Sequence, residues 1–462
     1  MTLGVLARPH VAALGVVLAG AVTLRTIGAG YGLPLPLLNP DEANIVPRAW
    51  AMTNGGGLDP GWFDYPSLLL YLNAPFQALF DNPSYGAARA VAIVLGLGGV
   101  AATYVLGRRA YGRVAGLVAA AAVAVAATHV AYSRMAVTDV LMTMLVTGAI
   151  ALALDGRIEL AGLAAGLAAS AKYPGALAAV PVAVAAFPQW RRLPSAGVLA
   201  VAGFAATSPF VLIRADDALD NIRRVQRLAR EGWLGFENDP ATPLAFLDRL
   251  WEATGPALAV AGLGLTIALV RRSRTDLVLA SFAGAYWLYL MPQAAHFDRY
   301  VLPLLPVLAV LAARTKPLAL LTAGLLVVPL VWTIGDAAEL TRTDTRLVAH
   351  SWAQRNLAPG EVVAADPSTL PLPGRNVVRL ALPGPGFEPD PRRSLDRLRE
   401  LGVTAVLVGG KVTDRVRAAP RRYPLELRFY DDLERLPVLY LIDPGGDLGG
   451  PWLRLYRLAA PS

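Results

Sequence analysis

The sequence predicts a mainly α polytopic membrane protein with about 11 transmembrane helices, followed by a C-terminal extracytoplasmic α/β domain. Of its 462 residues, 55% are hydrophobic and only 16% are charged, whereas a soluble domain has about 25% charged residues. Apolar runs long enough to cross a hydrocarbon core of about 30 Å recur through residues 1–335. Residues 336–462 differ, because they contain 18 Lys/Arg and 16 Asp/Glu. The chain therefore divides into a membrane domain, 1–335, and a soluble domain, 336–462.

Eleven spans can be identified from apolar runs in the membrane domain. Nine runs stand alone, at residues 10–30, 85–107, 114–132, 135–154, 194–213, 246–270, 275–291, 299–313 and 316–335. The stretch 158–187 is too long for one upright helix and breaks at Lys172-Tyr173-Pro174-Gly175, because proline disfavours helix in the residue before it. No convincing small-residue cleavage site follows the first run, so we interpret it as an uncleaved span.

The loop charges predict the orientation. Cations gather in one alternating set of loops, at Arg108, Arg109, Arg113, Arg157, Arg191, Arg192, Arg271, Arg272, Arg274, Arg314 and Lys316. The positive-inside rule places that set in the cytoplasm. The long loops 31–84 and 214–245 then face outward. We expect a multi-pass protein of the plasma (inner) membrane with a cytoplasmic N-terminus and an extracytoplasmic C-terminal domain.

The soluble domain alternates short apolar runs with helical patterns. "EVVAAD", "NVVRLAL", "VTAVLVGG", "LPVLYLID" and "WLRLYRL" are typical of strands, whereas "TDTRLVAHSWAQRNLAPG" and "DPRRSLDRLREL" are typical of helices. Together they predict an α/β domain.

Composition excludes several kinds of site. The chain has no cysteine, which rules out disulfides and thiolate metal sites, and its four histidines are scattered. The net charge of +8 lies mostly in the short loops, and the soluble domain has mixed signs. We therefore expect no nucleic-acid partner.

The unusual ionisable groups of the membrane domain all fall at predicted outward ends of spans, where one external cavity could contain them. They are Asp41, Glu42, Asp64, His129, Arg134, Asp139, Lys172, His296, Asp298 and Arg299. The middles of the spans are almost free of charge, whereas ion-coupled transporters place charges near the midplane. This pattern argues against transport.

Each group also has a purely structural interpretation. Asn39-Pro40-Asp41-Glu42 is a good helix start, with acids at the positive end of the helix dipole. Lys172 could reach the membrane interface with its flexible stem, and "HFDRY" at 296–300 could be an interfacial belt. Spacing alone leaves both interpretations open.

An ordered series of motifs resembles a known superfamily. The series is "PDE" at 40–42, "DYPSLLLYLNAPFQALF", "AARAVAIVLGLGGVAATYVLGRRAYG", "AYSRMAVTDVLMTMLVTGAIALAL", "GLAAGLAASAKYPGAL" and "HFDRYVLPLLPVL". Over about residues 35–312 it resembles the protein O-mannosyltransferase-like superfamily (glycosyltransferase family 39). Members are integral-membrane glycosyltransferases of the GT-C fold that use lipid-phosphate-linked sugars.

The resemblance implies roles for individual residues. Asp41 matches the catalytic carboxylate, and Glu42 would support it. Lys172, Arg299 and Arg134 are assigned to the donor phosphate, and Asp139, Asp64, Tyr65, His296 and Asp298 to the cavity and the acceptor. One departure is Ser67, which stands where many members have a second proline.

The chemistry agrees with these roles. A polyprenyl-phosphate sugar has a good leaving group, so the enzyme must activate an acceptor hydroxyl with a carboxylate and stabilise the departing phosphate with cations. We therefore expect an inverting, mannosyltransferase-like hexosyltransferase. No cofactor is required, although a divalent metal remains possible, and we predict no metal-binding residues.

The expected partners are the polyprenyl-phosphate sugar, membrane lipids, and an acceptor that is a lipid, a glycan or a protein. The sequence leaves two alternatives open. One is a transporter or flippase of polyprenyl lipid or solute, and the other is a non-catalytic membrane scaffold.

Overall fold

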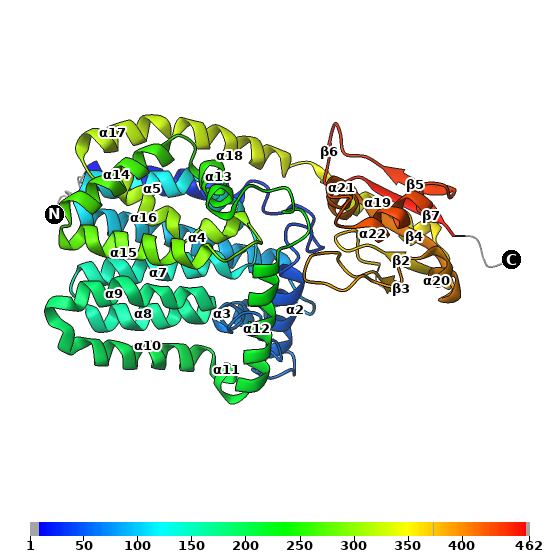
Figure 1. Cartoon of the computed structure of the whole chain (residues 1–462), viewed down its shortest axis with the longest axis horizontal. Coiled ribbons are helices and arrows are strands. Elements are labelled where there is room, and N and C mark those ends of the chain that lie inside the picture. The colour runs from blue at the N-terminus through cyan, green and yellow to red at the C-terminus, as the bar shows by residue number, and fades with distance from the viewer. Residues whose placement is uncertain (1–8, 373, 459–462) are drawn as a thin grey trace, which may run out of the picture.

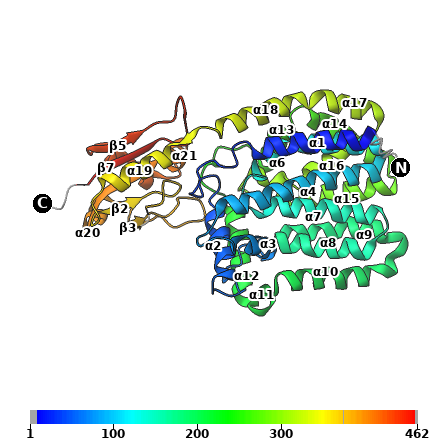
Figure 2. The same cartoon turned by 180° about the vertical axis from the view of Figure 1, so that it is seen from behind.

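The computed structural model describes residues 9–372 and 374–458. It has two parts, a bundle of helices and a sheet domain that lies at one end of the bundle (Figure 1). The first helix begins at the opposite end of the bundle, as the view from behind shows (Figure 2).

The long helices of the bundle run side by side, whereas α2, α3 and α12 lie at the end next to the sheet domain (Figure 1). The bounds are α1 Pro9–Thr26, α2 Glu42–Thr53, α3 Leu68–Gln77, α4 Tyr85–Tyr111, α5 Arg113–Val125, α6 Ala127–Tyr132, α7 Thr138–Leu154, α8 Ile158–Ala171, η1 Tyr173–Ala178, α9 Ala179–Ala186, η2 Phe187–Arg192, α10 Leu193–Thr207, α11 Pro209–Ile213, α12 Ala215–Glu231, α13 Thr242–Thr254, α14 Ala257–Arg271, α15 Arg274–Leu290, η3 Asp298–Val301, α16 Leu304–Ala312, α17 Lys316–Leu325 and α18 Val327–Glu339.

The predicted break at Lys172 is confirmed. Helix α8 ends at Ala171, Lys172 is extended with φ −158° and ψ 135°, and the 3-10 turn η1 begins at Tyr173. Lys172 therefore lies between two helices, at the level where α7 begins.

The predicted span 246–270 is bent. Helices α13 and α14 meet at an angle of 116°. Gly255 ends α13 with φ +57°, a conformation that favours glycine, and Pro256 precedes α14. This Gly-Pro pair turns the chain, so that α14 alone continues in the bundle.

The structure leaves the predicted number of spans untested. Within residues 9–372 and 374–458, two helices are long and apolar enough to cross a membrane, Tyr85–Tyr111 and Lys316–Glu339, and the bent α13–α14 pair would make a third. Other apolar helices are shorter, such as Arg113–Val125 and Ile158–Ala171.

The sheet domain contains the five predicted strands in one mixed sheet, with the order β3-β2-β4-β7-β5. Strand β2 is parallel to β3 and β4, and β7 is antiparallel to β4 and β5. Its elements are β1 Thr343–Asp344, α19 Thr345–Asn356, β2 Val362–Ala365, β3 Asn376–Arg379, α20 Leu395–Glu400, β4 Val403–Gly409, α21 Gly410–Ala418, α22 Pro424–Leu433, β5 Val438–Ile442, β6 Leu448–Gly449 and β7 Leu453–Arg457. The prediction of an α/β domain is confirmed.

A buried ion pair lies where the two domains meet. Arg346 of α19 binds Asp344 at 2.6 Å, and the two side chains are 4% and 0% exposed. The Arg346 Nη2 also donates to the carbonyl of Leu37, 2.8 Å away in the loop between α1 and α2. This arginine therefore joins the sheet domain to the loop that leads to Asp41.

Candidate active site

Asp41 occupies the N-terminal end of α2, but its carboxylate does not cap that helix. The Asp41 side chain forms no capping hydrogen bond, and the Asp41 backbone N–H donates to Asn39 Oδ1 at 2.9 Å. The Asn39 side chain thus supports the turn and leaves the Asp41 carboxylate for other contacts.

The Asp41 carboxylate binds two side chains through one oxygen. Its Oδ2 accepts hydrogen bonds from Arg299 Nη1 at 2.6 Å and from the Tyr65 hydroxyl at 2.9 Å. Its Oδ1 accepts no hydrogen bond from the residues that the structure describes, and the side chain is 21% exposed. One carboxylate oxygen is therefore anchored, while the other is free to accept a proton from a ligand.

The surroundings of Asp41 favour its ionised form. Burial alone would raise the pKa of Asp41, but the charge and the hydrogen bond of Arg299, the hydrogen bond from Tyr65 and the charge of Lys172 together lower this pKa below its ordinary value. Burial and the charge of Asp41 raise the pKa of Tyr65 well above its ordinary value, so that Tyr65 stays a proton donor. Asp41 is thus a carboxylate at neutral pH.

A second ion pair lies beside the first. Lys172 Nζ is 2.6 Å from Asp139 Oδ1, and the side chains are 10% and 1% exposed. The ammonium group also lies 5.4 Å from the ring centre of Tyr65 and 5.3 Å from that of Tyr300. Tyr65 therefore contacts both ion pairs, and the two cations share one site.

Two polar atoms of this site have no partner within the described part of the chain. They are Arg299 Nε and Asp139 Oδ2, both buried. A buried polar atom without a hydrogen-bond partner lowers the stability of the folded state. Such atoms occur at sites where a ligand supplies the missing hydrogen bond. The free Nε of Arg299 suits an anion.

Glu42 does not share the partners of Asp41 and instead binds Arg89, a residue that the sequence did not single out. Arg89 donates to both carboxylate oxygens of Glu42, at 2.9 and 2.7 Å, and to the carbonyls of Ala29 and Tyr31. Both side chains are at most 1% exposed. The signal that could have identified Arg89 is its place as the one charged residue of the apolar run 85–107.

The other predicted site residues lie in separate contacts. Asp64 pairs with Arg224 of α12. His296 lies between Asp239 and Thr242, at 3.1 and 3.2 Å. Asp298 accepts from the Tyr132 hydroxyl at 2.7 Å and from the Arg299 backbone N–H at 2.9 Å, so it supports the turn that carries Arg299.

Arg134 is not brought into the cluster around Asp41. Its guanidinium donates to the carbonyl of Leu24 at the end of α1, and the side chain is buried. The structure therefore gives Arg134 a place between helices, and its assignment to the donor phosphate stays a prediction.

Solved structures with the same arrangement of helices and sheet identify the fold. ArnT from Cupriavidus metallidurans in its apo state superposes with a TM-score of 0.61 at 15% identity, covering 98% of this chain and 99% of that one. The same protein bound to undecaprenyl phosphate gives 0.60 at 15% identity, with the same coverage. The Archaeoglobus fulgidus oligosaccharyltransferase AglB, with an inhibitory peptide and a dolichol-phosphate, gives 0.58 at 14% identity, covering 94% and 72%. The chain has the GT-C fold.

Sequence comparison supports the GT-C assignment over part of the chain. The family described as dolichyl-phosphate-mannose-protein mannosyltransferase matches residues 64–213, and no curated protein matches significantly. The matched segment contains Tyr65, Asp139 and Lys172. The resemblance predicted from the motifs is confirmed over this segment.

Ser67, which replaces the second proline of the expected motif, makes a hydrogen bond that proline could not make. The Ser67 backbone N–H donates to Ser208 Oγ at 2.9 Å, and proline has no N–H to donate. Serine therefore allows a contact between α3 and the end of α10 that the second proline would prevent.

No metal cluster was found in the part of this GT-C chain that the structure describes, where no three His, Asp or Glu side chains converge. Asp41 and Glu42 bind different partners, Arg299 and Arg89.

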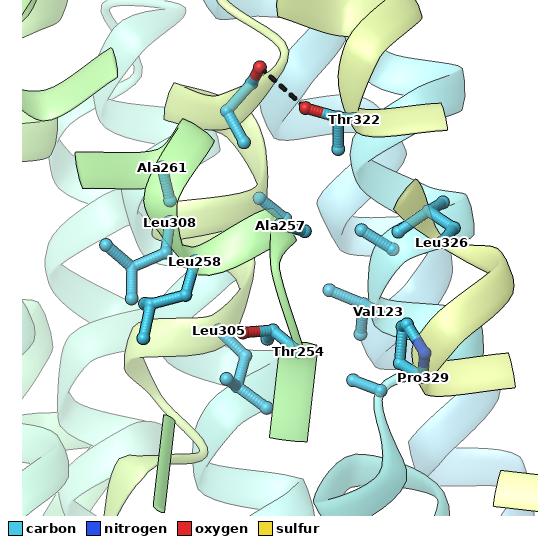
Figure 3. A pocket seen from close by; sticks show the side chains of 14 residues that line it. Val123, Thr254, Ala257, Leu258, Ala261, Leu305, Leu308, Thr322, Leu326 and Pro329 are labelled. Carbon is cyan, nitrogen blue, oxygen red and sulfur yellow. Dashed lines mark hydrogen bonds between the residues drawn. The ribbon is translucent and has the colours of Figure 1, made fainter. Parts of the chain in front are cut away.

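An apolar pocket inside the GT-C bundle offers no reactive group. It lies between α5, α14, α16, α17 and α18, and Thr322 stands at its edge (Figure 3), where its hydroxyl donates to the Ala312 carbonyl. Its volume is about 20 Å³, and the walls are mainly alanine and leucine side chains. Walls this apolar offer few hydrogen-bond partners to water or to a polar substrate.

Proposed function

We propose that this chain is an inverting glycosyltransferase that moves a sugar from a polyprenyl-phosphate-linked donor to an acceptor hydroxyl. The reaction would take place at the end of the bundle that carries the sheet domain, which the loop charges assign to the extracytoplasmic face.

The Asp41 carboxylate is the observation that carries this proposal. Its Oδ2 is fixed by Arg299 and Tyr65, whereas its Oδ1 is free. A carboxylate fixed in this way can accept a proton without losing its orientation. The cations Arg299 and Lys172 lie beside Asp41, and the Nε of Arg299 still has a hydrogen bond to donate.

The step requires one nucleophile and one leaving group. The acceptor oxygen attacks the anomeric carbon and forms the new glycosidic bond, while its proton passes to Asp41 Oδ1. The bond from the anomeric carbon to the phosphate oxygen breaks, and polyprenyl phosphate leaves with a second negative charge. Arg299 Nε and Lys172 would stabilise that charge. One direct displacement inverts the anomeric configuration.

The choice of donor is supported by the structural relatives. ArnT was solved with undecaprenyl phosphate and AglB with a dolichol-phosphate, which are both polyprenyl-type phosphates. Mannose is the first sugar to test, because the family that matches residues 64–213 is named for mannosyl transfer.

The test is turnover by the purified chain in lipid nanodiscs. A panel of polyprenyl-phosphate hexoses would be supplied with membrane extract as acceptor source, and released polyprenyl phosphate would be measured. We expect release from at least one donor, and a loss on the order of 100- to 1,000-fold in Asp41→Asn.

The matched control is Asp217→Asn, because Asp217 is an exposed aspartate that also pairs with an arginine, Arg214. It should retain full activity. Adding a chelator separates metal-dependent from metal-independent transfer. Release of polyprenyl phosphate at the same rate from Asp41→Asn and wild type would refute the role of Asp41, and no release from any donor would refute the reaction.

A further inference from the structure

A large cleft lies between the sheet domain and the loop that carries Asp41. Its volume is about 920 Å³. One wall is formed by Leu35, Pro36, Leu37, Pro40, Ala43 and Tyr85 of the helical domain. The other wall is formed by residues within 365–372 and 374–380, together with Arg346 and Lys411. Pro40 and Ala43 flank the Asp41-Glu42 pair, so the cleft reaches the segment that holds the candidate catalytic carboxylate.

Positive charge dominates the cleft. Its lining contains four cations, Arg346, Arg375, Arg379 and Lys411, and a single acid, Asp366. Asp366 is already bound by Arg393 at 2.8 Å and by the Tyr430 hydroxyl at 2.7 Å. Arg346 is likewise neutralised by Asp344.

Three cations of the cleft therefore remain without an ion pair, although the charge of Asp344 also acts on Lys411. No ion pair of Arg375, Arg379 or Lys411 occurs among residues 9–372 and 374–458. The Arg375 Nη2 donates to the Gln354 carbonyl at 3.0 Å, while its Nη1 is buried and has no partner in that part of the chain. Uncompensated cations around one hollow attract an anion, and guanidinium groups match phosphate and carboxylate geometry.

The remaining walls suit a sugar chain. Leucines and prolines supply apolar surface, and Tyr85 supplies an aromatic ring. Apolar walls with a few placed charges are the usual composition of a binding site for a small ligand. A glycan with acidic groups has both the apolar ring faces and the charges that such walls complement.

We propose that this cleft binds the acceptor, and that the acceptor is a glycan bearing phosphate or carboxylate groups. Arg375, Arg379 and Lys411 bind the acidic groups and so direct a neighbouring hydroxyl toward Asp41. This inference rests on the proposed transferase function, because the bound glycan is an acceptor only if sugar is transferred to it.

The test measures binding separately from turnover. The full chain in neutral phosphatidylcholine nanodiscs would be titrated with fluorescent mannotetraose carrying one phosphate monoester, and with the same tetrasaccharide without phosphate. We expect the phosphorylated probe to bind on the order of tenfold more tightly, and this advantage to shrink at high salt.

A matched pair of double variants locates the site. Arg379→Gln with Lys411→Gln removes two exposed cations from the cleft. Arg421→Gln with Arg422→Gln removes two exposed cations elsewhere on the sheet domain. The first pair should abolish the preference for the phosphorylated probe, and the second should leave it unchanged. Equal binding of the two probes, or an unchanged preference in the cleft variant, would overturn the inference.

Competition distinguishes the two sources of an acidic glycan. If nanodiscs containing phosphatidylglycerol displace the probe, the site accepts a lipid headgroup and the acceptor is lipid-linked. If they do not, the acceptor is a free glycan, and both outcomes support an anion site. Donor turnover is scored separately, so loss of phosphate preference with intact turnover rejects only this inference. Intact preference without turnover on any donor rejects the transferase and with it the acceptor role, and leaves the cleft as an anion-binding site.

Discussion

Asp41 shows why the sequence left its role open. By position it is the N-cap of α2, so a helix does start at the Asn-Pro-Asp-Glu segment, although the pattern predicts Asn39 as the cap and the helix begins two residues later. Its side chain instead contacts Arg299, which is 258 residues away in the chain. Local patterns predict local structure, whereas a partner so distant appears only in the folded chain. The same limit applies to Lys172 and Asp139, which the sequence singled out individually but did not pair.

The pH dependence of transfer should report the contact between Asp41 and Arg299. In the wild type the pKa of Asp41 is lowered, so the base form is lost only when the pH falls below the ordinary aspartate range. In Arg299→Gln the main lowering cause is gone and burial raises the pKa. The acid limb of kcat/KM should therefore move to higher pH, with a lower plateau because phosphate stabilisation is also lost.

The control for this profile is Arg224→Gln, which removes an arginine paired with Asp64 at the exposed edge of the same end of the bundle. Its acid limb should coincide with that of the wild type. An unchanged limb in Arg299→Gln would mean that Asp41 is not the titrating base.

Glu42 and Arg89 should contribute to stability more than to chemistry. Both are buried, and Arg89 also binds the carbonyls of Ala29 and Tyr31. Breaking a buried ion pair by removing one partner costs about 3–5 kcal/mol. Arg89→Gln should therefore lower the unfolding free energy by about that amount in a denaturant titration in detergent.

Arg223→Gln is the comparison, because it breaks an ion pair with Asp220 whose side chains are 74% and 76% exposed. An exposed pair is worth about 0–1 kcal/mol. Equal unfolding free energies of Arg89→Gln and Arg223→Gln would show that the buried pair does not stabilise the start of α2.

At the scale of elements, apolar runs and turn residues predicted most boundaries. The five strands, the break before Tyr173 and the apolar helices lie close to the predicted ranges. The sequence missed the bend between α13 and α14, although a glycine and a proline stand there. It also missed α21 and α22, which are short helices with no apolar run of their own. Pairing of the strands could not be predicted, because alternation defines a face but not a neighbour.

The bend after α13 should depend on glycine at position 255. Gly255 has φ +57°, and a Cβ there would lie 3.3 Å from Val328 and 3.4 Å from Trp332. Gly255→Ala should therefore destabilise the protein by about 1–2 kcal/mol, because a left-handed conformation is costly for alanine. Thermal unfolding in detergent would measure this loss.

Gly262 within α14 provides the opposite case. A Cβ there meets nothing within 4 Å, and alanine favours helix by about 1 kcal/mol over glycine. Gly262→Ala should be neutral or stabilising. If both variants behaved alike, the positive φ at Gly255 would not be what holds the bend.

At the scale of the whole molecule, the distribution of charge predicted two domains but not how they meet. The predicted boundary after residue 335 falls inside α18, which continues to Glu339, and the first strand begins at Thr343. The contact of Arg346 with the Leu37 carbonyl joins segments 309 residues apart. No sequence pattern in either segment predicts this contact. The cleft forms where the two domains meet, so it could not be predicted from the sequence either.

The junction should control transfer through the loop that ends at Asp41. Arg346→Leu leaves Asp344 buried without its partner and frees the Leu37 carbonyl, at a cost of about 3–5 kcal/mol. We expect faster proteolysis between residues 339 and 345 and a lower kcat, because the loop from Leu37 to Asp41 loses its anchor. Donor binding should persist, since Lys172 and Arg299 belong to other elements. Arg342→Gln tests the same linker without touching the buried pair, because Arg342 pairs with Glu339 at the surface. A protease-resistant Arg346→Leu variant with normal turnover would mean that the two domains are held together by other contacts and that the sheet domain does not position the catalytic loop.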